Sequence, residues 1–317
     1  MFYTVTLNPA LDIFIDAPDF QPGTVNLAAG LRRVWGGKGL NVARILKDLG
    51  ASCAAFGIAC GSTGDALVAG LSEAGIPADF VRAPGETRTN VKITDPNAGV
   101  TTDVNQPGPK VPQSALDELF ERLTSRVGAG DTVALCGSLP KGVWEGIYGE
   151  WTRELKALGV TVALDASKNA LRQGLFAGPD IVKPNLFELS ELVGREIHTA
   201  KDALWECQKI VDAGTGLVAL SLGEAGALFV RKDAHAFVPG LRVEVCSTTG
   251  AGDALLAALL VALNREDGLS EAGAFAVSVS AAHVSTPPGS PLQGERIGEL
   301  FAQVKENMAR SGLESAF

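Results

Sequence analysis

The stretch Ser247–Asp253 combines small residues with one carboxylate at a point where a strand-like segment gives way to a helix-like one. Gly250, Ala251 and Gly252 carry little or no side chain, so their backbone N–H groups can approach an anion closely, and the helix dipole adds about half a positive charge at that end. A carboxylate beside a bound phosphate, as Asp253 would be, can accept the proton of an attacking hydroxyl. This combination predicts phosphoryl transfer with Asp253 as the base.

The same residues have a plainer interpretation. Asp253 could cap the helix while the glycines close a turn, which explains most isolated Gly-Asp sequences. The turn alone favours neither interpretation, because so short a motif recurs by chance. The choice therefore depends on the other polar loops of the chain.

A second glycine-rich loop, Gly36–Asn41, also opens a helix-like segment. Gly37 offers a flexible backbone donor, and Lys38 and Asn41 add side chains suited to polar ligand groups. A tight entry into the helix would need the same glycines. The loop is not a Walker A motif, because its glycine spacing is wrong and no Ser or Thr follows Lys38 at the required position.

Lys183 and Asn185 follow the strand-like pair Ile181–Val182, and Glu188 lies one helical turn beyond Asn185. The side chains of Asn185 and Glu188 could therefore face the same Mg²⁺ ion or phosphate. A capping pair, with Asn185 at the N-cap and Glu188 three residues into the helix, predicts the same spacing. On spacing alone the capping pair is favoured.

The stretch Ser221–Gly226 joins two strand-like segments and has the composition of an ordinary glycine-rich hairpin turn. As a binding site it would lie at the carboxyl end of a strand, where open α/β sheets bind nucleotides. Asp12 and Arg88 stand in less regular stretches of the chain. Surface salt bridges are the plainer role for both.

These loops punctuate a chain in which short apolar runs alternate with amphipathic segments, the pattern of an α/β fold with a parallel sheet covered by helices. The run from Met1 to Leu11 is predicted as a strand. Further strands are predicted at Val133–Cys136, Val160–Leu164, Ile181–Val182 and Leu217–Leu222. Helices are predicted at Leu40–Leu49, Ala115–Val127, Trp144–Leu158, Ala254–Leu263, Ala272–Val284 and Ile297–Met308.

Two stretches interrupt the alternation, Asp12–Val34 and Thr87–Val104. In the second, Val91 and Ile93 alternate with polar residues ahead of the turn Pro96–Gly99, which predicts a β-hairpin. We expect the two stretches to form a small sheet beside the main one. No internal repeat or linker divides the chain, so we predict one domain over residues 1–317.

Composition excludes several classes of protein. Hydrophobic residues make up 46% of the 317 residues and charged residues 20%, which is ample for a folded core. The formal net charge of −9 argues against a nucleic-acid surface, and no apolar run approaches the ~20 residues of a membrane span. Five dispersed cysteines fit free thiols in a reducing cytosol, and three histidines supply no metal cluster. We therefore expect a cytoplasmic protein that binds neither nucleic acid nor membrane.

Taken in order along the chain, the motifs resemble the ribokinase-like carbohydrate kinase family, most closely its bacterial 1-phosphofructokinase and tagatose-6-phosphate kinase branch. The resemblance covers nearly the whole chain. It is carried by the segments Thr6–Asp12, Gly36–Ala43, Gly137–Pro140, Val182–Asn185, Ser221–Gly223 and Thr249–Asp253.

The resemblance implies a Rossmann-like α/β fold, with a mostly parallel central sheet covered by helices on both faces. It also implies a small β-sheet lid formed by about residues 12–34 and 87–105, and a homodimer in which the lids pack together. Two segments depart from the family pattern: the proline-rich Gln106–Pro109 at the edge of the lid, and Pro287–Pro291 near the implied adenine pocket.

The implied activity is the ATP-dependent phosphorylation of a sugar phosphate, with Mg²⁺ as cofactor. The segments Gly23–Leu27, Thr87–Thr94 and Thr102–Asn105 are similar to the 1-phosphofructokinase version, which favours conversion of fructose 1-phosphate to fructose 1,6-bisphosphate. The alternative within the class is a tagatose-6-phosphate kinase, or a related sugar or nucleoside kinase. Outside the class, the alternative is a non-catalytic sensor of sugar phosphates or nucleotides.

The resemblance also implies roles for single residues. Asp253 is the base, and Gly250, Ala251 and Gly252 stabilise charge on the moving phosphoryl group. Glu188 organises Mg²⁺ indirectly, through water. The implied sugar-phosphate-binding residues are Asp12, Gly37, Lys38, Asn41, Arg88, Lys92, Asn105 and Ser138. The implied nucleotide-binding residues are Lys183, Asn185, Ser221, Gly223, Gly226 and Gly252.

Overall fold

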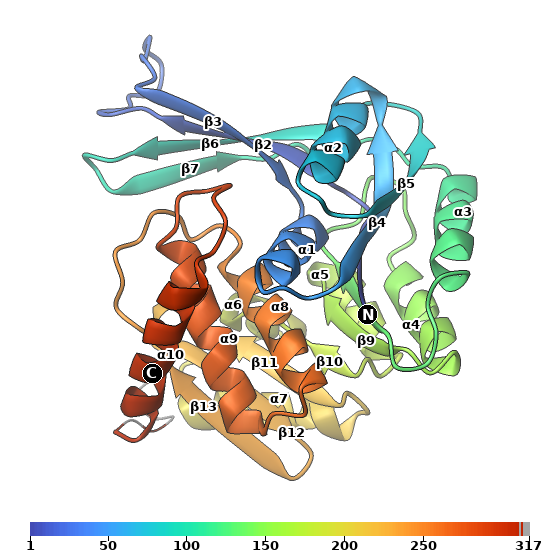
Figure 1. Cartoon of the computed structure of the whole chain (residues 1–317), viewed down its shortest axis with the longest axis vertical. Helices are drawn as coiled ribbons and strands as arrows, with labels where there is room; N and C mark the ends of the chain where they lie inside the picture. Colours follow the sequence, from blue (N-terminus) through green and yellow to red (C-terminus); the bar gives the residue numbers. More distant parts are fainter. Residues whose placement is uncertain (311, 313–317) are drawn as a thin grey trace.

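Nine strands form the main sheet of the computed structural model, which describes residues 1–310 and 312 (Figure 1). They span Phe2–Thr6 (β1), Cys53–Cys60 (β4), Ala78–Ala83 (β5), Thr132–Cys136 (β8), Thr161–Asp165 (β9), Ile181–Val182 (β10), Leu217–Ser221 (β11), Gly226–Arg231 (β12) and Ala234–Pro239 (β13). Their order across the sheet is β13-β12-β11-β10-β9-β8-β1-β4-β5. All neighbours are parallel except for the antiparallel pairs β11–β12 and β12–β13. The predicted mostly parallel sheet is thus confirmed.

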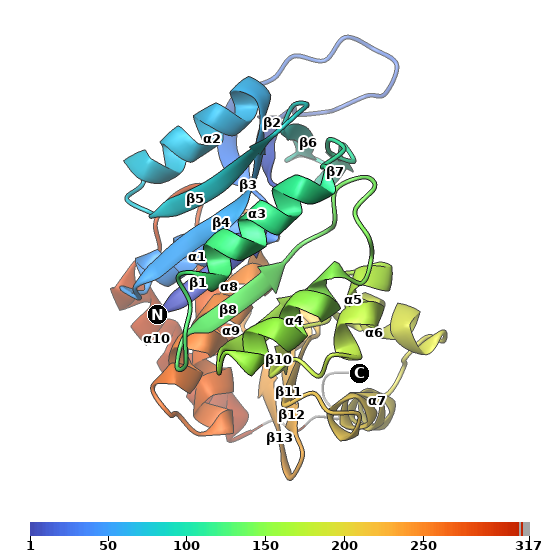
Figure 2. The same cartoon turned by 90° about the vertical axis from the view of Figure 1, so that its right-hand side faces the viewer.

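Helices cover both faces of this sheet (Figures 1 and 2). One face carries α1 (Lys38–Asp48), α2 (Gly61–Glu73), α8 (Ala251–Asn264), α9 (Leu269–Val284) and α10 (Gly294–Met308). The other carries α3 (Gln113–Thr124), α4 (Ile147–Ala157), α5 (Lys168–Leu175), α6 (Leu186–Val193) and α7 (Ala200–Asp212). Strand β8 shows the reason: Val133 and Leu135 enter one core, while Ala134 and Cys136 enter the other. None of the described helices has the length and apolarity that a membrane crossing requires.

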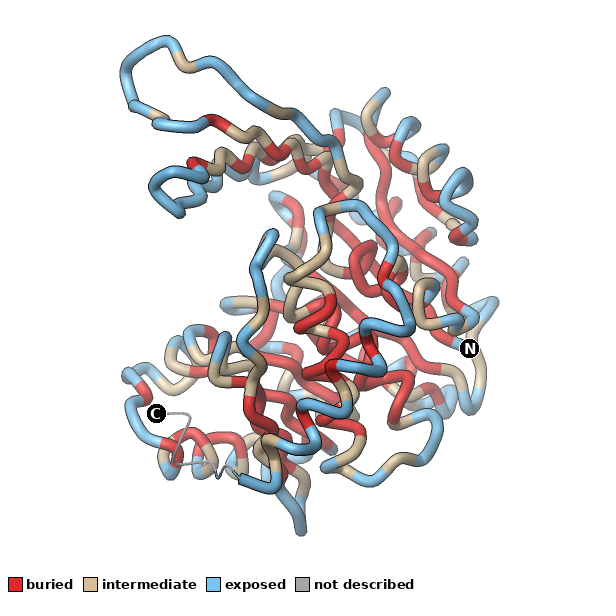
Figure 3. The backbone as a smooth tube through the Cα atoms, turned by 60° about the vertical axis from the view of Figure 1, so that its left-hand side comes forward, coloured by how far each residue is buried: buried red, intermediate tan, exposed pale blue. Residues whose placement is uncertain are grey.

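A separate small sheet projects beside the main one (Figures 1 and 3). Its strands are β2 (Ala10–Asp16), β3 (Gly30–Gly36), β6 (Arg88–Asp95) and β7 (Val100–Val104), in the order β3-β2-β6-β7. The two interrupting stretches therefore do form a second sheet, and β6 and β7 are the predicted hairpin. Asp95 shapes its turn by accepting from the backbone N–H groups of Asn97 and Ala98.

The prediction of one strand from Met1 to Leu11 is wrong. Strand β1 ends at Thr6 in the main sheet, and β2 begins at Ala10 in the small sheet, so the chain passes from one sheet to the other in between. Pro9 has no backbone N–H to offer a ladder, which explains why neither strand continues through it. The other predicted elements are present with ends shifted by a few residues; α4 begins at Ile147 rather than Trp144.

The carboxyl ends of parallel strands meet at one edge of the main sheet. Asp165 ends β9 there, Lys183 follows β10, and Ser221 ends β11. Asn185 forms a bridge to Ser221, which holds the two neighbouring loops together. Helices α1 and α8 begin at the same edge, so their amino-terminal turns face the strand ends.

All five cysteines are free thiols. Four are buried in the cores: Cys53, Cys60, Cys136 and Cys207. Cys246 is exposed on the segment that leads into α8, where its backbone N–H donates to the carbonyl of Val284 at 2.8 Å. The single domain predicted over residues 1–317 extends over residues 311 and 313–317, which lie outside the described part of the chain.

Candidate active site

Asp253 lies in the first turn of α8, three residues after Gly250. Gly250 is the N-cap residue and has the left-handed backbone conformation, with φ 85°, that favours glycine. Asp253 makes no capping hydrogen bond. Its Oδ2 instead accepts from Nδ2 of Asn41 on α1, at 2.7 Å in the buried interior. The interpretation of Asp253 as a helix cap is therefore wrong.

The environment of Asp253 raises its pKa to about 6. Burial is the largest cause, and the neighbouring carboxylate of Asp165 adds to it, while Lys38, the Asn41 hydrogen bond and Lys183 act in the opposite direction. A carboxyl group with this pKa is largely ionised at neutral pH and still holds a proton far better than an exposed aspartate. These are the properties of a general base.

Asp165 holds the two lysines of the site in place. Its Oδ1 accepts from Lys38 Nζ at 2.6 Å, and its Oδ2 lies 3.3 Å from Lys183 Nζ. The side chain is completely buried; burial alone would raise its pKa, but Lys183 and Lys38 hold that pKa below its usual range. Sequence reasoning missed this residue. The available signal was a carboxylate directly after the predicted strand Val160–Leu164.

The turn before α8 has the features of an anion site. A Cβ atom on Gly252 would lie 2.9 Å from Lys183 Nζ, so the ammonium group packs directly against the turn. His283 on α9 supports the turn from behind, with Nε2 3.0 Å from the carbonyl oxygen of Thr249. Backbone N–H groups at the start of a helix, together with an adjacent lysine, can stabilise a phosphoryl group.

The residues predicted for the nucleotide lie along the neighbouring strand ends. The backbone N–H of Ser221 donates to the carbonyl of Pro184 at 3.0 Å, so the loops of Asn185 and Gly223 are adjacent. Packing alone requires glycine at position 226, because a Cβ there would lie 2.1 Å from the backbone oxygen of Val238. Any contact of Gly226 with a ligand stays a prediction.

Asn185 and Glu188 form the capping box that their spacing favoured. The Asn185 side chain accepts from the Glu188 N–H at 2.8 Å, and Glu188 Oε2 accepts from the Asn185 N–H at 2.9 Å. The cap does not remove Glu188 from the site, since its Oε1 lies 3.6 Å from Lys38 Nζ. Within residues 1–310 and 312, no group of three or more His, Cys, Asp or Glu side chains could hold a metal. Glu188 Oε1, which the capping box does not use, is a carboxylate oxygen of the kind that Mg²⁺ or its water ligands prefer.

On the side of the small sheet, Asp12 is buried and accepts from Asn90 Nδ2 at 2.8 Å. Arg88 donates to the carbonyl oxygens of Asn8 and Gln106 at 3.2 Å and 3.1 Å. Neither side chain forms a surface salt bridge among the described residues, so the plainer role considered for both is wrong. Gly36 leaves room for Asp12, because a Cβ at Gly36 would lie 2.1 Å from Asp12 Oδ2.

Asn8 connects Arg88 to Ser138 and was not predicted as a site residue. Its carbonyl oxygen accepts from Arg88, and its Nδ2 lies 3.2 Å from Ser138 Oγ. Asn8 Oδ1 is buried without a hydrogen-bond partner. Gly37, with φ 117°, packs against the same loop, because a Cβ there would lie 3.2 Å from the Cα of Pro9. The position of Asn8 two residues after β1, at the carboxyl edge, was the signal that could have identified it.

Lys92 and Asn105 lie farther along the small sheet. Lys92 is buried and pairs with Asp103 of β7 at 3.0 Å, and Asn105 is exposed just after β7. A cleft of about 630 Å³ opens beside this sheet, between Pro84–Glu86 and the segment 106–110. Arg88 lines the cleft but Asp253 does not, so the chemistry suggested by Asp253 belongs at the carboxyl edge of the main sheet rather than in this cleft.

Comparison with known proteins adds the following similarities. The model of the pfkB family of carbohydrate kinases matches residues 5–291. The 1-phosphofructokinase of Rhodobacter capsulatus is 37% identical over 87% of this chain and 88% of its own. That of Escherichia coli K12 is 34% identical over 95% and 96%.

Among solved structures, phosphofructokinase-2 from Escherichia coli in complex with substrates and products superposes with a TM-score of 0.91 at 30% identity, covering 96% of this chain and 99% of that one. Ribokinase from Thermotoga maritima superposes with a TM-score of 0.73 at 21% identity, over 96% and 99% of the two chains, and shares the fold.

Proposed function

The chain belongs to the pfkB family of carbohydrate kinases, and we propose that it transfers the γ-phosphoryl group of ATP to the C6 hydroxyl of fructose 1-phosphate. The products would be fructose 1,6-bisphosphate and ADP. The family is one of phosphotransferases that act on sugar hydroxyls, and several relatives named 1-phosphofructokinase are 31% to 38% identical over most of the chain. The observation that carries the proposal is the buried carboxylate of Asp253, with its raised pKa, at the glycine turn that opens α8.

In the proposed reaction, the acceptor hydroxyl oxygen attacks the γ-phosphorus while the bond from that phosphorus to the β,γ-bridging oxygen breaks. The hydroxyl proton passes to Asp253, and ADP leaves with the bond's electron pair. Asn41 occupies Oδ2 of Asp253, so Oδ1 is the oxygen that we assign to the proton. The proton then returns to solvent when the product leaves.

The charge problem in this reaction is the approach of two phosphorylated molecules. Lys183 and the N–H groups of Gly250, Ala251 and Gly252 would stabilise the moving phosphoryl group, and the packing of Lys183 against Gly252 supports this role. Lys38 stands on the other side of Asp165 and stays protonated, because Asp165, Glu188 and Asp253 hold its pKa above its usual value even though burial alone would lower it. Positive groups are thus concentrated locally in a chain whose net charge is −9.

We assign the nucleotide to the strand ends that carry the predicted residues Lys183, Asn185, Ser221, Gly223 and Gly226, with support from the bridge between the two loops. Mg²⁺, when bound with ATP, neutralises phosphate charge. Glu188 is the carboxylate that would act on its water ligands, since Oε1 remains turned toward Lys38 and only Oε2 is used in the capping box.

We assign the acceptor to the side of the small sheet. Asp12 and Asn41 would bind its hydroxyls, while Arg88 and Lys38 would bind its phosphate. The remaining predicted residues of this group are Gly37, Lys92, Asn105 and Ser138. A β-sheet lid that closes over the acceptor would exclude water and limit wasteful hydrolysis of ATP.

A panel of acceptors tests the proposal. Purified protein is given MgATP with fructose 1-phosphate, fructose 6-phosphate, tagatose 6-phosphate or unphosphorylated sugars, and ADP and the sugar product are both measured. The highest kcat/KM is expected with fructose 1-phosphate. A higher value with tagatose 6-phosphate or fructose 6-phosphate would keep the kinase and change its substrate. ATP-dependent transfer to none of them would favour a non-catalytic sensor.

We also infer a cytoplasmic homodimer that packs through the small sheets. Apolar side chains exposed on that sheet and its β2–β3 loop support this: Val25, Leu27, Leu31, Val100 and Val104 are each more than half exposed. A solved form of the related phosphofructokinase-2 is described as tetrameric. Light scattering on the wild type and on Leu31→Lys tests the assembly: the dimer should dissociate in the variant, and a monomeric wild type would refute it.

A further inference from the structure

Arg44 contacts the side-chain amide of Asn41, and that amide contacts Asp253, the proposed base. Arg44 lies one turn after Asn41 on α1, and its Nη2 donates to Asn41 Oδ1 at 2.6 Å. Asn41 Nδ2 donates in turn to Asp253 Oδ2 at 2.7 Å. Arg44 forms no ion pair within 4.0 Å with any described residue. A guanidinium group that is mostly removed from solvent is thus directed to a neutral amide instead of to a carboxylate.

The direction of an asparagine amide is decided by its neighbours. A guanidinium group has donors only, so the carbonyl oxygen of Asn41 must face Arg44. The NH₂ group must then face Asp253. A flipped amide would place two donors against each other at Arg44 and two oxygens against each other at Asp253. Arg44 therefore determines which end of Asn41 meets the proposed base.

The end that faces Asp253 matters for proton transfer. A hydrogen bond donated to a carboxylate favours its ionised form, and only the ionised form can accept a proton. Burial and Asp165 act the other way on Asp253. The amide of Asn41, held by Arg44, is the polar group that directly opposes them at Oδ2.

The titratable groups around the Arg44 guanidinium and the Asp253 carboxylate come from five elements and from the segment after β10. Arg44 is faced by Asp48 of its own helix, Asp12 of β2, Asp253 of α8 and His283 of α9. Burial lowers the pKa of His283, which favours its neutral form beside Arg44. Asp253 is further faced by Asp165 at the end of β9, by Lys38 of α1, and by Lys183 after β10.

We propose that Arg44 is a positioning residue for phosphoryl transfer: it fixes the direction of the Asn41 amide and thereby keeps the Asp253 carboxylate ionised and aligned. The proposal rests on the proposed function, because it requires Asp253 to be the base. Arginine suits this role better than lysine, since its planar donors have a fixed direction and it remains protonated.

The test is the pH dependence of turnover. Wild type, Arg44→Met and Arg44→Lys are compared with fructose 1-phosphate and MgATP between about pH 5 and about pH 8.5. In Arg44→Met, the acid limb of kcat should move up by about one pH unit, because the Asp253 anion loses an oriented donor and a nearby cation. The shift alone should lower turnover at pH 7 about twofold, and the lost alignment of Asp253 should lower the turnover on the high-pH plateau as well, with KM values changed less than about threefold. Arg44→Lys should give a smaller shift in the same direction, and it keeps the test usable if Arg44→Met does not fold.

Two further variants distinguish the orienting effect of Arg44 on Asn41 from a general effect of losing a positive charge or of disturbing α1. Lys47→Met removes a cation from the same helix without touching Asn41, and should leave the acid limb in place. In an Asn41→Ala background, Arg44→Met should produce less than half of its usual shift, because no amide is left to orient. An equal shift in both backgrounds would overturn the proposal, as would an unshifted profile in Arg44→Met.

Failure of this proposal is distinguishable from failure of the proposed function. A wild type that phosphorylates no sugar phosphate would remove the proposed function itself, and an Asp253→Asn variant with full turnover would remove the assignment of Asp253 as its base. An active wild type with an inactive Asp253→Asn variant and unshifted Arg44 variants would remove only the role of Arg44.

Discussion

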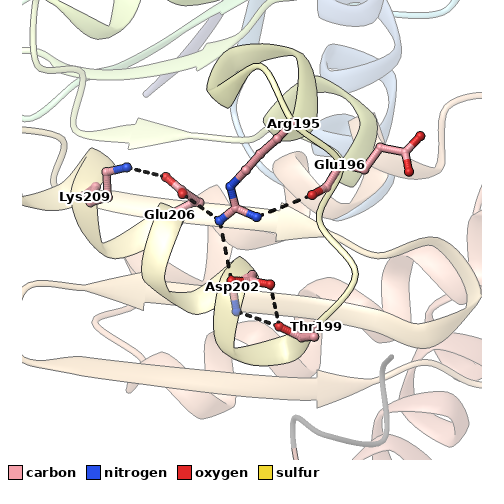
Figure 4. A network of polar contacts seen from close by, with 6 residues as sticks. All are labelled: Arg195, Glu196, Thr199, Asp202, Glu206 and Lys209. Atoms are coloured by element: carbon pink, nitrogen blue, oxygen red, sulfur yellow. Dashed lines mark hydrogen bonds and ion pairs between the residues drawn. The ribbon is translucent and has the colours of Figure 1, made fainter.

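Two clusters in this chain each contain two cations and at least two carboxylates, and they connect these charges differently. The first consists of Lys38, Asp165, Lys183 and Asp253 at the carboxyl edge of the main sheet. The second consists of Arg195, Asp202, Glu206 and Lys209 where α6 leads into α7 (Figure 4).

In the second cluster, both cations contact the more buried carboxylate. Glu206 accepts from Lys209 Nζ at 2.7 Å and from Arg195 Nη2 at 3.0 Å. The hydrogen bond from Lys209 is the largest cause that lowers the pKa of Glu206. Thr199 closes the cluster by capping α7 through the N–H of Asp202. Every charge there is matched locally, and the cluster stabilises the helix.

In the first cluster, both lysines contact Asp165, and Asp253 receives its hydrogen bond from the neutral amide of Asn41. Burial, with Asp165 beside it, raises the pKa of Asp253, because neither lysine pairs directly with its carboxylate. The comparison shows that this chain keeps Asp253 available as a base by pairing the two nearby lysines with a second carboxylate, Asp165. Three substitutions can break or sharpen that contrast.

The largest effect is expected from Asp253→Asn. Turnover should fall by roughly 10² to 10⁴-fold, the usual contribution of a general base, with much smaller changes in the KM for ATP and for the sugar phosphate. Steady-state kinetics with both substrates varied measure this. Glu206→Gln is the matched control, because it neutralises a buried carboxylate outside the site, and it should retain wild-type turnover.

Asp165→Asn removes the carboxylate that separates the lysines from Asp253. The free energy of unfolding should fall by about 3 to 5 kcal/mol, because the buried ammonium group of Lys183 and the partly buried one of Lys38 lose their partner. The acid limb of kcat should move to lower pH, since the like charge beside Asp253 is gone. Urea unfolding and pH–rate profiles check the two parts. A limb that moves to higher pH would contradict the contrast.

Asp253→Asn should raise the free energy of unfolding, whereas Asp165→Asn should lower it. The pKa of Asp253 is about 6 in the folded chain and about 3.9 when unfolded. The folded state therefore loses stability as pH rises through this window, and carries a cost above it. Asp253→Asn should raise the free energy of unfolding by about 2 to 3 kcal/mol at pH 8 and leave it unchanged below about pH 4. Denaturant unfolding at both pH values tests this, and a loss at pH 8 would count against a raised pKa.

The smallest effect is expected from Glu206→Gln. The pKa of Glu206 is lowered on folding, so its contribution is present above its unfolded pKa and is lost as pH falls through the folded one. The variant should lose about 1 kcal/mol of unfolding free energy at pH 7, because its cations are partly exposed. The difference should shrink below about pH 4. If Glu206→Gln were more stable than the wild type at pH 7, Glu206 and Asp253 would not differ in the way proposed.

Much of the fold and part of the site could be predicted from the sequence. Continuous apolar runs such as those of β8 and β10 identify strands buried on both faces, and glycine loops before helices identify Gly37 and Gly250. Local patterns of this kind depend on neighbouring residues alone. The sheet order and the contact between Asn41 and Asp253, 212 positions apart, depend on how the elements pack.

The residues that were missed show the same limit. Asp165 follows an ordinary buried strand, and only the approach of two lysines from other loops gives it a role. Asn8 gains significance from Arg88 and Ser138, which are 80 and 130 positions away. The break between β1 and β2 could have been inferred, because Pro9 removes a ladder donor. The apolar residues Tyr3, Val5, Leu7 and Leu11 keep the spacing of a single strand on both sides of Pro9, which is why one strand was predicted.

The exposed Cys246 makes the chain suited to chemical labelling without mutagenesis. The other four thiols are buried in the cores, so a maleimide fluorophore should attach at one position only. That position lies seven residues before Asp253, on the segment fastened to the end of α9 through Val284. Fluorescence from such a probe would report on the glycine turn during nucleotide titrations of the wild type and of every variant described above. No cysteine has to be added or removed for this purpose.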